Sequence, residues 1–141
     1  MSLKLPTSVG HQNVLKEGTK MQHGLDESVY RNIAAVLELA AITRSSFGPN
    51  GLNKLIVNNL EKLFMTADAG VILRELEVQH PAARIVIDAS KQQDAEMGDG
   101  CNLVVILAAA LLERARELLR MGLKASVVAH GFRIACKQAL K

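Results

Sequence analysis

Apolar residues recur with a helical period along most of the chain after residue 25. Between residues 25 and 47 they lie three to four positions apart, which predicts a helix with one buried stripe: Val29, Ile33, Val36, Leu37 and Ala40. Asp26 or Ser28 can cap the start of this helix, and Gly48-Pro49 must end it. The first predicted element is therefore an amphipathic helix that ends at a glycine-proline turn.

Two parts of the chain lack this helical period. Residues 1 to 24 are polar and irregular, and we expect a flexible N-terminal tail there. In residues 53 to 68, two short β-prone runs, 55 to 57 and 63 to 65, flank an asparagine-rich turn and predict a hairpin. Because an isolated hairpin is only marginally stable in water, we expect this one to pair with something else.

Four more helices are predicted in the second half of the chain. A short one covers residues 70 to 76, a second runs from Pro81 to Gly98, a third from Gly100 to Met121, and a last one starts near Ser126. The third is apolar on all sides from residue 103 to 112, which predicts burial on all sides. A chain of 141 residues can hardly cover such a helix, so we expect a part of a larger protein, of mainly α class with a small β-hairpin.

Composition and charge exclude several classes of function. The net charge is only +3, and the few aromatic residues do not alternate with basic ones, which argues against nucleic-acid binding. The longest apolar run has ten residues, whereas a membrane span needs about 20. Cys101 and Cys136 form neither a zinc pattern nor a disulfide framework, so we expect reduced thiols in a cytosolic protein, with Cys136 in the core.

The Gly98-Asp99-Gly100 segment is the first candidate site. Its spacing is neither a dinucleotide-binding fingerprint nor a P-loop, and alone it is explained as a turn between two helices with Asp99 as N-cap. Alternatively, the glycines allow an anion to approach the backbone at the N-terminus of the following helix. Because a carboxylate repels phosphate, Asp99 would then imply a nucleotide that carries Mg²⁺.

Two earlier segments are equally ambiguous when taken singly. Residues 45 to 51, SSFGPNG, are explained as a helix stop, or as a turn that exposes backbone to a ligand. Residues 66 to 68, Thr-Ala-Asp, are explained as a helix cap, or as a carboxylate placed at a site. Each segment alone leaves both interpretations open.

The order of the segments is more specific than any one of them. Residues 45 to 54, 66 to 68, 80 to 83 (HPAA) and 98 to 100 follow one another as in the N-terminal equatorial segment of group II chaperonins, the ATP-driven protein-folding rings. Segments of that family read TxxGPxGxxK, TNDG or TNDA, HPAA and GDGTT. The chain resembles this family from about residue 25 onward. The resemblance implies that residues 25 to 141 are the first half of a helical equatorial domain, without the intermediate and apical domains.

The resemblance implies a role for each matching residue. In the family, the Gly-Pro-x-Gly turn lies against the nucleotide, and the loop and first helical turn after Gly-Asp hold the phosphates. The nucleotide-binding residues implied here are Phe47, Gly48, Pro49, Gly51, Gly98, Gly100, Cys101 and Asn102. Asp99 is implied as the Mg²⁺ ligand, and Asp68 as the catalytic carboxylate near the terminal phosphate and the attacking water.

Some residues depart from the family pattern. Cys101 stands where the family usually has threonine, and a thiol is a weaker donor and a poor Mg²⁺ ligand. Val71 likewise replaces a usual threonine, so we expect weakened rather than abolished nucleotide affinity. Asp68-Ala69 and Asn102 are similar to one subunit type of the eukaryotic cytosolic chaperonin.

The resemblance also implies partners and an activity. The parent protein is expected to be a cytosolic ATPase subunit of a double ring, with ATP and Mg²⁺ as cofactors, and with the hairpin in contact with neighbouring subunits. Client proteins are expected to bind through regions absent here, without nucleic acid or membrane. The chain alone is expected not to hydrolyse ATP, because the second catalytic aspartate lies in the hinge domain. The alternative is a non-enzymatic truncated paralogue, a helical module that only makes ring contacts.

Overall fold

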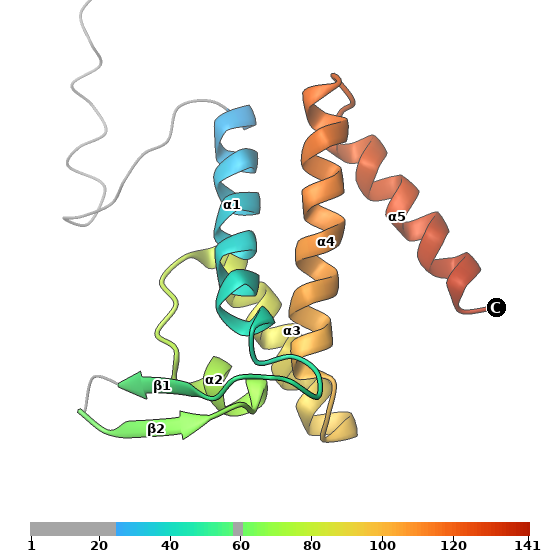
Figure 1. Cartoon of the computed structure of the whole chain (residues 1–141). Helices are drawn as coiled ribbons and strands as arrows, with labels where there is room; N and C mark the ends of the chain where they lie inside the picture. The colour runs from blue at the N-terminus through green and yellow to red at the C-terminus, as the bar shows by residue number, and fades with distance from the viewer. Residues whose placement is uncertain (1–24, 58–60) are drawn as a thin grey trace, which may run out of the picture.

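The computed structural model describes residues 25–57 and 61–141, which form five helices and one β-hairpin (Figure 1). The elements are α1 (Leu25–Arg44), β1 (Lys54–Val57), β2 (Leu63–Thr66), α2 (Ala69–Glu75), α3 (Pro81–Met97), α4 (Cys101–Arg120) and α5 (Ala125–Ala139). The predicted class, mainly α with a small hairpin, is confirmed. The expected N-terminal tail and the asparagine-rich turn at 58 to 60 lie outside the described residues.

The core lies where α1, α3 and α4 meet. In Figure 1, α1 and α4 stand side by side, and α3 packs against both of them near the end that carries the hairpin. The buried cluster consists of Val36, Leu39, Ala40, Leu73, Ala83, Ile87, Val105 and Ala109. Alanines at three of these positions let the helix backbones approach closely, which suits a chain with few aromatic residues.

The two strands of the hairpin, β1 and β2, are antiparallel. Their register places Lys54 opposite Thr66 and Val57 opposite Leu63. Ile56 is buried, whereas the other apolar face is 61 to 75% exposed and consists of Leu55, Val57, Leu63 and Met65. Within the described part of the chain the sheet has two strands. The expected pairing of the hairpin with something else therefore stays a prediction.

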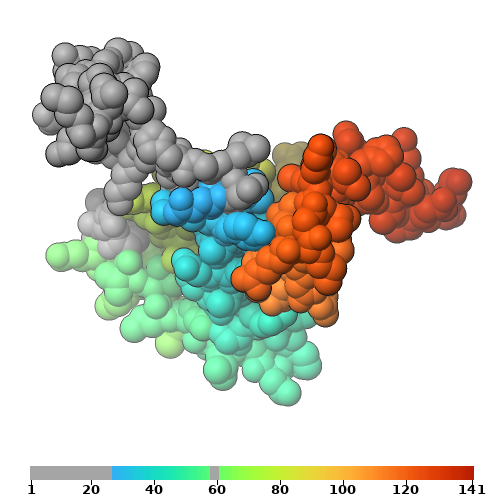
Figure 2. Space-filling model, turned by 90° about the horizontal axis from the view of Figure 1, so that it is seen from above, coloured from blue at the N-terminus to red at the C-terminus, as the bar shows by residue number. Residues whose placement is uncertain are grey.

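Within this chain α4 is covered on one side, where α1 and α3 pack against it, whereas Leu103 and Leu107 are each 54% exposed and Leu111 is 42% exposed. An apolar run that this chain leaves partly uncovered agrees with the expectation of a part of a larger protein, and burial of the run on all sides stays a prediction. The expectation that Cys136 lies in the core is wrong, because Cys136 is exposed. The α5 helix extends from one side of the molecule (Figure 2) and buries Val128 instead.

None of the helices in residues 25–57 and 61–141 combines the length and the apolar character needed to cross a bilayer.

Candidate functional site: a pocket between two glycine turns

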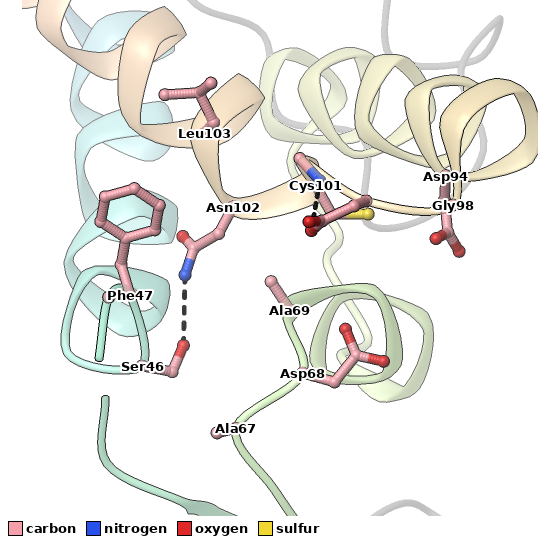
Figure 3. A pocket seen from close by; sticks show the side chains of 13 residues that line it. Ser46, Phe47, Ala67, Asp68, Ala69, Asp94, Gly98, Cys101, Asn102 and Leu103 are labelled. Atoms are coloured by element: carbon pink, nitrogen blue, oxygen red, sulfur yellow. Dashed lines mark hydrogen bonds between the residues drawn. The ribbon is translucent and has the colours of Figure 1, made fainter. Parts of the chain in front are cut away.

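Three segments that are distant in sequence meet around one pocket of about 360 Å³ (Figure 3). The turn after α1 contributes residues 46 to 48, and the start of α2 contributes residues 67 to 69. The end of α3 contributes Asp94, and the connection from α3 to α4 with the first turn of α4 contributes residues 98 to 103. The three motifs that were ambiguous singly are therefore neighbours in space.

The pocket brings together most of the residues that sequence analysis singled out. Its lining includes Phe47, Gly48, Asp68, Gly98, Asp99, Gly100, Cys101 and Asn102. Pro49 and Gly51 do not line it. Gly51 instead closes the turn, because its N–H donates to the Gly48 carbonyl at 3.0 Å.

Sequence reasoning missed Asp94, and it included Ser46 in a candidate segment without giving that residue a role. Asp94 lies near the C-terminal end of α3, where a negative charge opposes the helix dipole. An acidic residue at that end of a predicted helix was a usable signal of a special role. Ser46 gave no such signal, because its position depends on how α1 packs against α4.

The N-terminus of α4 rules out one of the two explanations given for Asp99. The N-cap is Gly100 with φ +86°, so the alternative in which Asp99 caps the helix is wrong. The chain reaches α4 through this left-handed conformation, which glycine adopts far more readily than aspartate. Having no side chain, Gly100 caps none of the N–H groups in the first turn of α4. These groups and the positive end of the helix dipole are therefore available to an anion in the pocket.

Asp99 is held in place by its own loop. Its Oδ1 accepts a 2.6 Å hydrogen bond from the Gly100 N–H, and its backbone carbonyl accepts one from Gln93 Nε2 at 3.2 Å. The Asp99 side chain is exposed. The carboxylate therefore has a defined position and remains reachable from solvent.

Asp68 combines the two roles that the sequence left open. It is the N-cap of α2, where its Oδ1 accepts a hydrogen bond from the Gly70 N–H at 2.9 Å. The Thr66 hydroxyl in turn accepts from the Asp68 N–H at 3.0 Å. The same carboxyl group also lines the pocket, so capping and a place in the site are compatible.

The charge of the pocket is one-sided. Asp68, Asp94 and Asp99 line it, and the described lining residues include no lysine, arginine or histidine. Arg74 approaches from outside the lining, with its guanidinium 3.6 Å from Asp94 Oδ2. A bare polyanion would be repelled here, whereas an anion that brings a divalent cation would be attracted.

Cys101 faces the aspartates rather than open solvent, and it is 6% exposed. A Cβ placed on Gly70 would lie 3.5 Å from Cys101 Sγ and 3.3 Å from Asp94 Oδ2, so the thiol and this carboxylate border the same small space. Burial raises the pKa of the Cys101 thiol, the hydrogen bond and charge of Asp94 raise it further, and the hydrogen bond with Ser90 opposes them. The thiol is therefore protonated at neutral pH.

The two thiols should differ in reactivity. We expect iodoacetamide at pH 8 to alkylate Cys136 at least about tenfold faster than Cys101, because alkylation needs an accessible thiolate and the pKa of Cys101 is raised. Mass spectrometry of the single-cysteine variants Cys101→Ser and Cys136→Ser measures both rates. The same labelling in denaturant is the control, where the rates should converge; equal rates in the native protein would contradict the prediction.

Comparison with known proteins gives the family to which this chain belongs. Residues 39–141 match the model of the TCP-1/cpn60 chaperonin family. This chain therefore belongs to the TCP-1/cpn60 chaperonin family.

Relatives within the family narrow the similarity to one subunit type. T-complex protein 1 subunit theta of Bos taurus is 57% identical over 139 residues, which cover 99% of this chain and 25% of that protein. The theta subunit of Homo sapiens is 56% identical over 139 residues, which again cover 99% of this chain and 25% of that protein. The theta subunit of Caenorhabditis elegans is 52% identical over 141 residues, which cover 100% of this chain and 26% of that protein. The chain thus spans about a quarter of the length of the curated relatives it matches. The resemblance inferred from the ordered segments is confirmed, and the subunit type indicated by Asp68-Ala69 and Asn102 is theta.

Proposed function

We propose that this chain is the nucleotide-binding part of a subunit of an ATP-dependent cytosolic chaperonin, and that the pocket between the glycine turns binds Mg-ATP. The observation that carries the proposal is the chemistry of the lining. Three aspartates, three glycines and the uncapped start of α4 surround one space without a basic side chain among the described lining residues. This set favours phosphate accompanied by a divalent cation over phosphate alone.

The residues present fit Mg²⁺ bound together with a nucleotide. The described residues hold no group of three or more histidine, cysteine, aspartate or glutamate side chains arranged to bind a metal by themselves. Mg²⁺ usually keeps several waters and takes one or two carboxylates plus phosphate oxygens, so a complete protein cage is not required. Asp99 is the proposed ligand. When bound, Mg²⁺ neutralises charge on the phosphates.

The other lining residues would bind and orient the nucleotide. The backbone of Gly98 and Gly100 and the first turn of α4 would receive the phosphates, with Cys101 and Asn102 in that turn. The turn at Phe47 and Gly48 would lie against the nucleotide from the other side. Asp68 would orient the attacking water, and phosphoryl transfer then depends mainly on positioning and charge neutralisation.

The proposal extends to the whole protein through family membership. Residues 25 to 141 would be the first part of the equatorial domain, and the subunit would assemble with other chaperonin subunits in a double ring. Unfolded clients would bind through regions outside this chain. The 141-residue chain would bind Mg-ATP without meaningful turnover, because a further aspartate from the hinge domain completes catalysis in the family.

Thermal unfolding of the 141-residue chain tests nucleotide binding directly. At Mg-ATP concentrations near 100 times Kd we expect about 2.7 kcal/mol of stabilisation, which raises Tm by several degrees. ATP with EDTA should give a much smaller rise, since the aspartates then repel the phosphates. Mg²⁺ alone is the control. Equal Tm values with Mg-ATP and with buffer at millimolar nucleotide would refute the proposal.

A second candidate function is a ring-contact module that does not use nucleotide. The exposed apolar face of the hairpin favours it, because Leu55, Val57, Leu63 and Met65 present an apolar surface beside strand edges that pair with no further strand among the described residues. Co-migration of the chain with a large chaperonin ring that is unaffected by Mg-ATP would support this candidate over the first.

A further inference from the structure

Asn102 links two segments of the pocket that are far apart in sequence. It is the second residue of α4 and is 8% exposed. Its Nδ2 donates to the Thr43 carbonyl at 3.0 Å and to Ser46 Oγ at 3.3 Å, across 59 and 56 residues of chain (Figure 3 shows the bond to Ser46). The side chain therefore ties the start of α4 to the end of α1.

The Thr43 carbonyl is the centre of this link. It accepts hydrogen bonds from the Ser46 N–H at 3.1 Å and from Ser46 Oγ at 2.7 Å, in addition to the bond from Asn102. The two bonds from Ser46 shape the turn itself, and the bond from Asn102 fixes that turn to a different helix. The residues that follow, Phe47 and Gly48, line the pocket opposite the loop at Asp99.

The orientation of the Asn102 amide is determined by this arrangement. Because a carbonyl oxygen can only accept, Nδ2 and not Oδ1 must face Thr43. The consequence is that Oδ1 is buried without a hydrogen-bond partner among the described residues. An unpaired buried acceptor lowers stability. The fold therefore gains less from Asn102 than its two bonds alone would suggest, which points to a role beyond stability.

We propose that Asn102 is a positioning residue that sets the distance between the two glycine turns of the pocket. This inference rests on the proposed nucleotide-binding function. Asn102 holds the Phe47-Gly48 turn against the start of α4 through Thr43 and Ser46. Without this link the turn moves independently of the Gly98–Gly100 loop, and the pocket loses its shape for the nucleotide while the helices stay folded.

The test compares nucleotide affinity with stability in the same variants of the 141-residue chain. Asn102→Leu keeps the branching at Cγ and the number of side-chain heavy atoms, removes the Nδ2 donor and also removes the unpaired Oδ1. We expect about a tenfold increase in the Kd for Mg-ATP by calorimetry, with a Tm change no larger than that of Val128→Ala. Val128 is a buried residue of α5 outside this pocket, and Val128→Ala is the matched control that should leave Kd unchanged.

A double-mutant cycle with Ser46→Ala separates positioning from general destabilisation. If Asn102 acts through the turn, the effects of Asn102→Leu and Ser46→Ala on Kd are non-additive, whereas Asn102→Leu and Val128→Ala add. Should the leucine variant fail to fold, Asn102→Ala takes its place in the same cycle.

These measurements distinguish failure of the positioning role of Asn102 from failure of the proposed nucleotide-binding function. If the wild-type chain shows no Mg-dependent ATP binding, the proposed function fails and this inference fails with it. If the wild type binds Mg-ATP and Asn102→Leu binds it equally well, the inference alone is overturned. The inference is also overturned if Val128→Ala, at an equal loss of stability, raises the Kd for Mg-ATP as much as Asn102→Leu does.

Discussion

Replacing Asp99 by asparagine should weaken Mg-ATP binding about tenfold to a hundredfold without unfolding the chain. Asparagine keeps an oxygen that can accept the hydrogen bond from the Gly100 N–H, so the loop should retain its shape. What is lost is one negative charge facing the cation. At about 4 Å and an effective dielectric constant near 20, such an attraction is worth roughly 4 kcal/mol, and the exposure of Asp99 reduces it.

The same substitution should raise the affinity for ATP in the absence of a metal ion. Removal of the Asp99 charge lowers the repulsion of the phosphates, because Asp68 and Asp94 are then the two carboxylates left in the lining. Calorimetry with Mg-ATP and with ATP in EDTA therefore gives effects of opposite sign. A variant that merely damages the pocket would weaken the binding of Mg-ATP and also the binding of ATP in EDTA.

Asp88→Asn is the matched control for this pair of measurements. Asp88 is an exposed residue of α3 that does not line the pocket, so the variant changes the net charge equally. We expect it to leave the affinity for Mg-ATP within about twofold of the wild type at physiological ionic strength. Unchanged Mg-ATP binding by Asp99→Asn would remove Asp99 from the metal site.

The sequence predicted the local features of the fold well because local chemistry decides them. The glycine-proline turn after α1 and the proline at the start of α3 act within a few residues, and the helices begin and end near the predicted positions. The gathering of the three motifs was predictable only through their order, which resembles a known family. Spacing alone left each motif explained equally well as a cap or a stop.

The errors concern faces whose environment is set by distant parts of the chain. The apolar run of α4 gave no information on which side α1 would cover, and the periodicity of α5 did not show that Cys136 would face outward. Likewise, the link from Asn102 to Thr43 joins residues 59 positions apart, and no local rule reaches that far. The alternative in which Asp99 caps α4 is wrong, because the N-cap position and its left-handed backbone fall on Gly100.

Gly51→Ala should be the most destabilising single-methyl change in the turn after α1. A Cβ at this position would lie 2.3 Å from the Ser46 carbonyl oxygen and 2.8 Å from the Ser46 carbonyl carbon. Both atoms belong to the backbone and cannot rotate away as a flexible side chain would. The turn must therefore open, and the 2.9 Å bond from the Leu52 N–H to the Ser45 carbonyl is strained or lost.

We expect a loss of about 2 to 3 kcal/mol in the free energy of unfolding, which corresponds to a fall in Tm on the order of 10 °C. Gly131→Ala is the control, because a Cβ at this glycine of α5 meets no atom within 4 Å. Alanine there should stabilise the helix by about 0.5 to 1 kcal/mol. Thermal and urea unfolding measure both variants.

The same variant tests what Gly51 does for the site. Gly51 does not line the pocket, so its influence on nucleotide affinity should follow the displacement of Phe47 and Gly48 and appear together with the lost stability. If Gly51→Ala instead keeps the wild-type Tm and loses only Mg-ATP affinity, this glycine contacts the nucleotide itself, as the family resemblance implies for that position. Closure of the turn would then not be the reason for a glycine at residue 51.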